Sequence, residues 1–174
     1  MKFGICNEVF EGWSIDDTIR FVAETGYDAI EIAPFTLAQY VTEIPVAERQ
    51  RIRGVAADNG IEVSAIHWVL IKTEGLYMTH TDAAIREKTS DYFCELVDCC
   101  ADLGGKAIVV GSPKLRNLLP GVSFQQAWEL ACETFAKSIK RAEDKGVTIC
   151  FEPLAPLVAL TSYCLLYTSD AADE

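Results

Sequence analysis

AETGYDAIEIA, at residues 23–33, reads as the end of a helix, a glycine and a short β-rich run, and this cadence occurs three more times in the chain. The other copies are ADNGIEVSAIH (57–67), ADLGGKAIVVG (101–111) and AEDKGVTICFE (142–152). Each copy places a glycine at the turn, and glycine adopts the left-handed conformation that closes a helix without steric cost. The repeated stretch therefore predicts four helices, each followed at once by a strand.

The starts of these helices are also marked in the sequence. Ser14 with Asp17, and Ser123 with Gln126, resemble the capping box, in which a hydroxyl and a side chain three residues later satisfy the first free backbone groups. Pro45 occupies a position that the first turn of a helix tolerates. The segments between start and glycine have apolar residues at the 3.6-residue period of amphipathic helices.

The order of elements predicts the fold class. With an opening strand at about residues 2–7, short apolar strands alternate strictly with helices, which implies parallel strands joined by right-handed crossovers. The class is α/β, and two architectures stay open, an open doubly wound sheet and part of a (β/α)₈ barrel. The longest stretch without periodicity, residues 68–81, follows the third strand, where a barrel carries an active-site loop.

Composition excludes several kinds of function. The chain has 174 residues and a net charge of −11, so it lacks the basic face that nucleic acid requires. No segment has about 18 consecutive apolar residues, and the start of the chain does not resemble a signal peptide, so we expect no membrane span and a cytoplasmic location. The seven cysteines form no C-x-x-C pair and lie mostly in apolar stretches, which predicts buried, reduced thiols at Cys94, Cys99, Cys100, Cys132 and Cys150.

Candidate chemical residues lie at the ends of the predicted strands, because parallel α/β folds bind ligands there. These residues are Asn7, Glu8, Glu31, His67, Trp68, Ser112 and Glu152. Glu152 ends the apolar run VTICF, where an unpaired buried carboxylate is costly, so a metal or catalytic role is favoured over an ion pair. His67 can equally be a hydrogen-bonded core imidazole, and Glu31 a salt-bridge partner.

Common nucleotide and hydrolase motifs are missing from the sequence. CNEVFEGW follows the first strand in place of a glycine-rich turn, and there is no G-x-x-x-x-G-K-[ST] or G-x-S-x-G. Lys114 and Arg116 could contact a phosphate, but a solvated loop is the favoured interpretation.

Five segments together resemble the first five strands of the xylose isomerase-like (β/α)₈ superfamily, which includes sugar phosphate isomerases and epimerases. These segments are KFGICNEVF (2–10), YDAIEIAPF (27–35), IEVSAIHWVL (61–70), GGKAIVVGSP (104–113) and GVTICFEPLAP (146–156). The resemblance implies a partial TIM barrel and a divalent metal (Mn²⁺, Mg²⁺, Co²⁺ or Zn²⁺). It also implies that a Glu ending the fifth strand holds this metal together with Asp, His and Glu from later strands.

The resemblance then assigns roles to the candidate residues. Glu152 matches the first metal ligand, so the metal site within this sequence is incomplete, and Glu152 and His67 are predicted to be catalytic. The residues predicted to bind substrate are Glu31, His67, Trp68, Asn7 and Ser112. The implied reaction is proton transfer next to a sugar carbonyl through an ene-diolate.

The end of the sequence departs from this pattern. SYCLLYTSDAADE (162–174) is typical of translated sequencing-adapter sequence, so we expect residues 1–156 to be the N-terminal part of a barrel and residues 157–174 to be a non-native tail. The predicted protein is therefore a fragment of a metal-dependent isomerase or epimerase of sugars or sugar phosphates. The fragment is expected to be inactive by itself, and the full-length protein from which it derives can be a homo-oligomer. The alternatives are a dehydratase or endonuclease IV-like hydrolase of the same superfamily, and a non-catalytic open-sheet binding domain.

Overall fold

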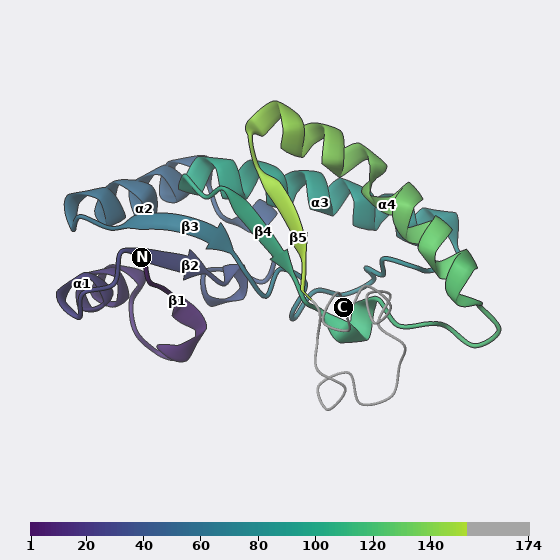
Figure 1. The fold of residues 1–174 in the computed structure, drawn as a ribbon, viewed down its shortest axis with the longest axis horizontal. Coiled ribbons are helices and arrows are strands. Elements are labelled where there is room, and N and C mark those ends of the chain that lie inside the picture. The colour runs from purple at the N-terminus through teal and green to yellow at the C-terminus, as the bar shows by residue number, and fades with distance from the viewer. Residues whose placement is uncertain (153–174) are drawn as a thin grey trace.

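Five short strands pair side by side in the order in which they occur in the chain (Figure 1). The computed structural model describes residues 1–152. The strands are β1 (Gly4–Cys6), β2 (Ala29–Ile32), β3 (Glu62–Ile66), β4 (Ala107–Val110) and β5 (Thr148–Phe151). Every neighbouring pair is parallel. The predicted α/β class with five parallel strands is confirmed.

Four α-helices connect the strands. They are α1 (Ile15–Glu24), α2 (Val46–Asp58), α3 (Ala83–Leu103) and α4 (Phe124–Lys145). Short 3₁₀ turns follow three of the strands or precede α2, at Asn7–Val9, Pro34–Thr36, Val41–Glu43 and Pro113–Leu115. Three of the loops thus have local structure that the hydrophobic period does not reveal.

The strand order distinguishes between the two architectures that the sequence leaves open. A doubly wound sheet reverses its strand order at a switch point, whereas a barrel adds each strand beside the preceding one. Here the order is sequential, and consecutive helices contact each other from α1 to α4. Figure 1 shows α2, α3 and α4 along one side of the sheet. The arrangement is that of a partial (β/α)₈ barrel.

The helix ends agree with their sequence signals. The hydroxyl of Ser14 accepts a hydrogen bond from the backbone N–H of Asp17, and Ser123 forms a reciprocal capping box with Gln126. Gly104 and Gly146, which end α3 and α4, have the positive φ angles expected of left-handed caps. Pro45 lies one position earlier than the first turn, since it is the N-cap of α2. This shift is within the usual uncertainty of a helix boundary.

The core lies between the sheet and the helices. Ile30 and Ile32 of β2 are fully buried, while Glu31 between them stays partly exposed on the opposite face. Phe93 of α3 and Phe135 of α4 meet with ring centroids 4.6 Å apart. The alternation of bulky and small residues in β2 therefore separates a helix-facing side from the side that carries polar groups.

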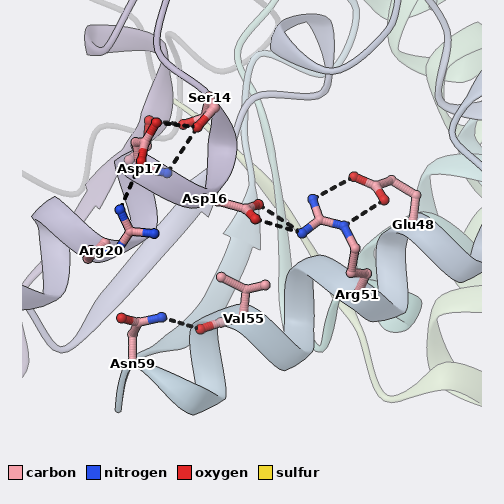
Figure 2. Close-up of polar contacts among 9 residues, drawn as sticks. Ser14, Asp16, Asp17, Arg20, Glu48, Arg51, Val55 and Asn59 are labelled. Atoms are coloured by element: carbon pink, nitrogen blue, oxygen red, sulfur yellow. Dashed lines mark hydrogen bonds and ion pairs between the residues drawn. The ribbon is translucent and has the colours of Figure 1, made fainter.

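Polar side chains join the first two helices at the surface (Figure 2). Nη1 of Arg51 lies 2.9 Å from both carboxylate oxygens of Asp16, and the rest of the guanidinium binds Glu48. These contacts raise the pKa of Arg51. All three side chains are more than a third exposed, so the contacts orient α1 against α2 without contributing much stability.

The prediction that the cysteines are buried is only partly correct. Cys99 and Cys100 are buried and Cys94 is half-buried, but Cys132 and Cys150 are exposed. Cys150 lies on β5 and Cys132 on α4, and neither position is covered by the helix–sheet core. Apolar neighbours in sequence therefore did not ensure burial at these two positions.

No helix within residues 1–152 is both long enough and apolar enough to cross a membrane. The predicted non-native tail, 157–174, lies outside the described residues, as does Pro153 after Glu152.

Candidate active site

Three predicted site residues meet at the carboxyl ends of the strands. Nδ1 of His67 lies 3.2 Å from Oε2 of Glu31, and its Nε2 lies 3.5 Å from Oε2 of Glu152. Glu31 belongs to β2, and His67 and Glu152 directly follow β3 and β5. The sheet thus gathers residues from three separate parts of the sequence around one imidazole.

Backbone hydrogen bonds hold two of these residues in line with the sheet. The N–H of His67 donates to the carbonyl of Ile32, and the N–H of Glu152 donates to the carbonyl of Val110. Each bond extends the pairing of parallel strands by one residue. The position of each side chain is therefore fixed by the sheet and not by a flexible loop.

The two carboxylates favour the charged imidazolium. The hydrogen bond that His67 donates to Glu31 is the main cause that raises the pKa of His67; partial burial opposes it, and the charges of Glu31 and Glu152 add to it. The ring is only 22% exposed, so these interactions are weakly screened. His67 therefore carries a proton to higher pH than an isolated histidine.

The donor set between His67 and Glu152 fits a cation. When neutral His67 donates its Nδ1–H to Glu31, its Nε2 lone pair faces the carboxylate of Glu152, so two acceptors oppose each other. A proton or a metal ion between them relieves that repulsion. Carboxylate oxygens bind Mn²⁺ and Mg²⁺, and Glu152 would contribute a ligand atom to such a metal.

Glu152 is less buried than its apolar sequence context predicts. Its side chain is 38% exposed, which corrects the expectation of a buried carboxylate. Gly111, next to the end of β4, leaves the space that the carboxylate occupies, because a Cβ there would lie 2.7 Å from Oε2 of Glu152. A side chain at position 111 would therefore push Glu152 away from its present position.

Trp68 covers one side of His67. The two rings are stacked with centroids 6.0 Å apart, and Trp68 adopts a positive φ of 56° that non-glycine residues rarely take. Ser112 also has a positive φ, 39°. Trp68 and Ser112 line one hollow of about 350 Å³, and Trp68 also borders a larger one of about 760 Å³. Strained backbone is therefore found at two of the predicted substrate-binding positions.

Asn7 uses its polar atoms within the protein. Its amide oxygen accepts from the backbone N–H of Ala33 at 2.7 Å, and its amide nitrogen donates to the hydroxyl of Thr36 at 2.8 Å. The side chain is buried and joins the end of β1 to the turn after β2. Its predicted contact with substrate stays a prediction.

Arg116 corrects an expectation of the sequence. We expected a solvated loop, but Arg116 is only 2% exposed, and its Nη2 donates to the backbone carbonyl of Glu152 at 2.7 Å. Lys114 is exposed as expected. The guanidinium is stable inside the protein because the backbone carbonyls of Val110 and Glu152 accept its hydrogen bonds in place of water.

Cys6 is a site residue that sequence reasoning missed. Its thiol and ligand atoms of Glu31 and His67 all lie within 4.8 Å of one another. Its position at the end of the first strand was a signal of the same kind that pointed to the other candidates.

Fold and site together define one class of protein, a parallel βα barrel with its polar residues at the carboxyl ends of the strands. The family model of the xylose isomerase-like TIM barrel matches residues 19–172. The chain belongs to this family.

The solved structures that are similar to this chain include sugar 3-epimerases. A D-psicose 3-epimerase solved in the presence of D-fructose is 25% identical with a TM-score of 0.72, over 88% of this chain and 53% of that chain. Protein SMc04130 from Sinorhizobium meliloti 1021 is 25% identical with a TM-score of 0.70, over 98% of this chain and 57% of that chain. D-psicose 3-epimerase from Clostridium cellulolyticum H10, solved with D-tagatose, is 21% identical with a TM-score of 0.70, over 90% of this chain and 53% of that chain. At this identity the similarity supports the fold alone.

The chain spans about half the length of these solved structures. A search among curated proteins gave no match.

Proposed function

We propose that this chain is part of a divalent-metal-dependent isomerase or epimerase that acts on a sugar or sugar phosphate. The observation that carries the proposal is the convergence of Glu31, His67 and Glu152 at the strand ends of a chain of this family. The similarity to a 3-epimerase solved with D-fructose supports a keto sugar as the substrate class. A small-molecule partner and a cytoplasmic location belong to the same proposal.

The proposed chemistry is proton transfer next to a carbonyl. A divalent metal bound at Glu152 supplies a positive charge that stabilises negative charge developing on the sugar oxygens. The Glu152 carboxylate removes the proton from the carbon next to the carbonyl, which gives an ene-diolate, and the proton returns to the neighbouring carbon or to the opposite face. His67 donates a hydrogen bond to a substrate hydroxyl, and Trp68 beside it offers an apolar wall for the sugar ring.

Glu31 keeps His67 ready for this role. Because Glu31 accepts from Nδ1, the other ring nitrogen is directed toward Glu152 and the reacting carbon. Protonation of His67 to the charged imidazolium also favours hydrogen-bond donation to a sugar oxygen. Glu31 is therefore proposed to position His67 as well as to line the pocket.

Solvent exchange tests the proposal directly. The protein to test is the one encoded by the full natural reading frame that includes residues 1–156. When it is incubated with a keto sugar and Mn²⁺ in D₂O, we expect deuterium on the carbon next to the carbonyl, as detected by NMR. Glu152→Gln is expected to slow this exchange by about 10²–10⁴-fold, the usual contribution of a general base. Cys132→Ser, an exposed change on α4, serves as the control and is expected to exchange at the wild-type rate.

Two results would contradict the proposal. Exchange that is absent with every keto sugar and every divalent metal tested would remove the reaction, and exchange that survives Glu152→Gln would remove the assigned base. The 174-residue chain by itself is proposed to be inactive, and turnover by that chain with a keto sugar and Mn²⁺ would contradict this part alone.

A further inference from the structure

A cysteine, a carboxylate and an imidazole converge on the same side of the first three strands. Cys6 pairs with Glu31 in the register of β1 and β2, and adjacent strands bring paired side chains close together. A register shift after Ile30 then pairs Glu31 with Ala65, two residues before His67. Alternation along β3 places Ala65 and His67 on the same side, so the three side chains come together.

The distances suit a small cation. Sγ of Cys6 and ligand atoms of Glu31 and His67 all lie within 4.8 Å of one another. Ligands of a tetrahedral zinc ion lie about 3.5 Å apart, given bonds of about 2.0–2.3 Å. Closure by roughly 1 Å, within the reach of side-chain rotation, therefore completes a three-ligand site.

The chemistry of these donors is selective. Sulfur and imidazole ligands favour Zn²⁺, Co²⁺ and related ions over Mg²⁺ and Ca²⁺, and three protein ligands leave a fourth position for water. A metal-bound imidazole usually donates its other ring N–H to a carboxylate. Glu152 lies 3.5 Å from Nε2 of His67 and supplies that acceptor when Nδ1 binds the cation.

A nearby carboxylate gives a second, independent indication of a cation. Oε2 of Glu8 is buried and has no hydrogen-bond partner within the described residues. The Glu8 carboxylate lies beside the Cys6 thiol. A buried carboxylate oxygen without a donor is costly, and a positive charge beside Cys6 relieves that cost.

We propose that Cys6, Glu31 and His67 form a binding site for a thiophilic divalent cation of the zinc class, with Glu152 outside the ligand set. On binding, the Cys6 S–H bond breaks, a sulfur–metal bond forms and the proton passes to solvent. The site goes beyond the proposed function, because a cation bound to Nδ1 of His67 replaces the hydrogen bond from Nδ1 to Glu31 and Cys6 has no part in the proton transfer assigned to Glu152.

Cobalt spectroscopy tests the site without any substrate. The reduced 174-residue chain is stripped of metal with a chelator, desalted and titrated with Co²⁺. We expect a thiolate-to-cobalt charge-transfer band in the near ultraviolet and visible bands of tetrahedral cobalt, both of which disappear when Zn²⁺ is added. Cys6→Ser is expected to abolish the charge-transfer band, and Glu31→Gln and His67→Asn to weaken Co²⁺ binding by about tenfold or more.

Matched variants show which atoms bind the ion. Cys132→Ser, the same change at an exposed cysteine, is expected to keep the complete spectrum. Glu152→Gln is expected to keep the charge-transfer band. Circular dichroism and thermal unfolding in chelator check that each variant is folded, and Cys6→Ala provides a second substitution if Cys6→Ser is not.

Three outcomes would overturn the proposal. They are a wild-type chain without a charge-transfer band, a band that survives both substitutions of Cys6, and Co²⁺ binding that is lost in Glu152→Gln but retained in Cys6→Ser. Since no turnover is measured, each outcome leaves the proton transfer assigned to Glu152 untouched. Conversely, failure of the deuterium exchange leaves this site untouched.

Discussion

His67 stands between two carboxylates, and they do not act on it equally. Glu31 makes the hydrogen bond at 3.2 Å that is the main cause of its raised pKa, whereas Glu152 lies farther away at 3.5 Å. The site is therefore asymmetric: one carboxylate orients the imidazole, and the other faces the nitrogen that remains available for chemistry.

This asymmetry predicts a difference between two neutralising variants. In the metal-free chain, Glu31→Gln is expected to lower the pKa of His67 more than Glu152→Gln does, as measured by NMR titration of the imidazole protons. Because the folded-state pKa of His67 lies above its unfolded value, this group stabilises the fold fully below about pH 6.5 and loses that contribution as pH rises through the folded-state pKa. Equal shifts in the two variants would show that the hydrogen bond is not the main cause.

Gly111 provides a test of the space around Glu152. Gly111→Ala places a methyl group 2.7 Å from the present position of Oε2 of Glu152, which is too close, so the carboxylate must move. We expect the variant to remain folded, to lower the pKa of His67 slightly and to reduce deuterium exchange by about tenfold or more, since small misplacements of catalytic groups are costly.

Gly54→Ala is the matched control, because nothing lies within 4 Å of its added methyl group. In that control we expect wild-type exchange and a gain of about 0.5–1 kcal/mol in helix stability. Wild-type exchange in Gly111→Ala would contradict the assigned position of Glu152.

At the level of elements, the helix ends are the features that local sequence controls most directly. Ser123 and Gln126 satisfy backbone groups at the start of α4, which packs along α3 through Phe93 and Phe135. The cap therefore stabilises a helix that packs against α3 and β5. Burial of the paired aromatic rings depends on this helix being in place.

Loss of the cap has a measurable cost. Ser123→Ala is expected to lower the free energy of unfolding by about 1 kcal/mol, as measured by urea denaturation followed by circular dichroism. Gln125→Ala, an exposed change in the same turn, should alter stability by less than about 0.5 kcal/mol. If both variants lost the same amount, the capping interaction would not be the cause.

For the whole molecule, the net charge of −11 limits the partners of the chain. A protein that binds nucleic acid gains most of its affinity from cations that neutralise phosphates. Here the site itself contains three carboxylates, Glu8, Glu31 and Glu152, so the charge at the strand ends repels a polyanion.

We therefore expect no binding of duplex DNA at physiological salt, even at concentrations of about 10⁻⁴–10⁻⁶ M, where ordinary non-specific binding occurs. Fluorescence anisotropy of a labelled duplex measures this, and a plasmid-nicking assay with Zn²⁺ or Mn²⁺ extends the test to catalysis. Nicking that Glu152→Gln abolishes would favour the hydrolase over the isomerase.

Much of the fold was predictable because its signals are local. A glycine that ends a helix, a capping serine and a run of β-branched residues each act through neighbours a few positions away. The order of helices and strands, the α/β class and the strand-end candidates Glu31, His67 and Glu152 followed from such signals. The motifs, taken together in order, also pointed to the family that the family model then confirmed.

Only the tertiary structure decided which groups meet. The register of β1, β2 and β3 brings Cys6 to Glu31 and His67, the end of β4 leaves space at Gly111, and a buried Arg116 binds the carbonyl of Glu152. Register, burial and side-chain contact depend on residues far apart in sequence, and no local pattern encodes those distances. The sequence by itself therefore determined the elements and the family, while the pairing of the strands decided the partners of each polar side chain at the strand ends.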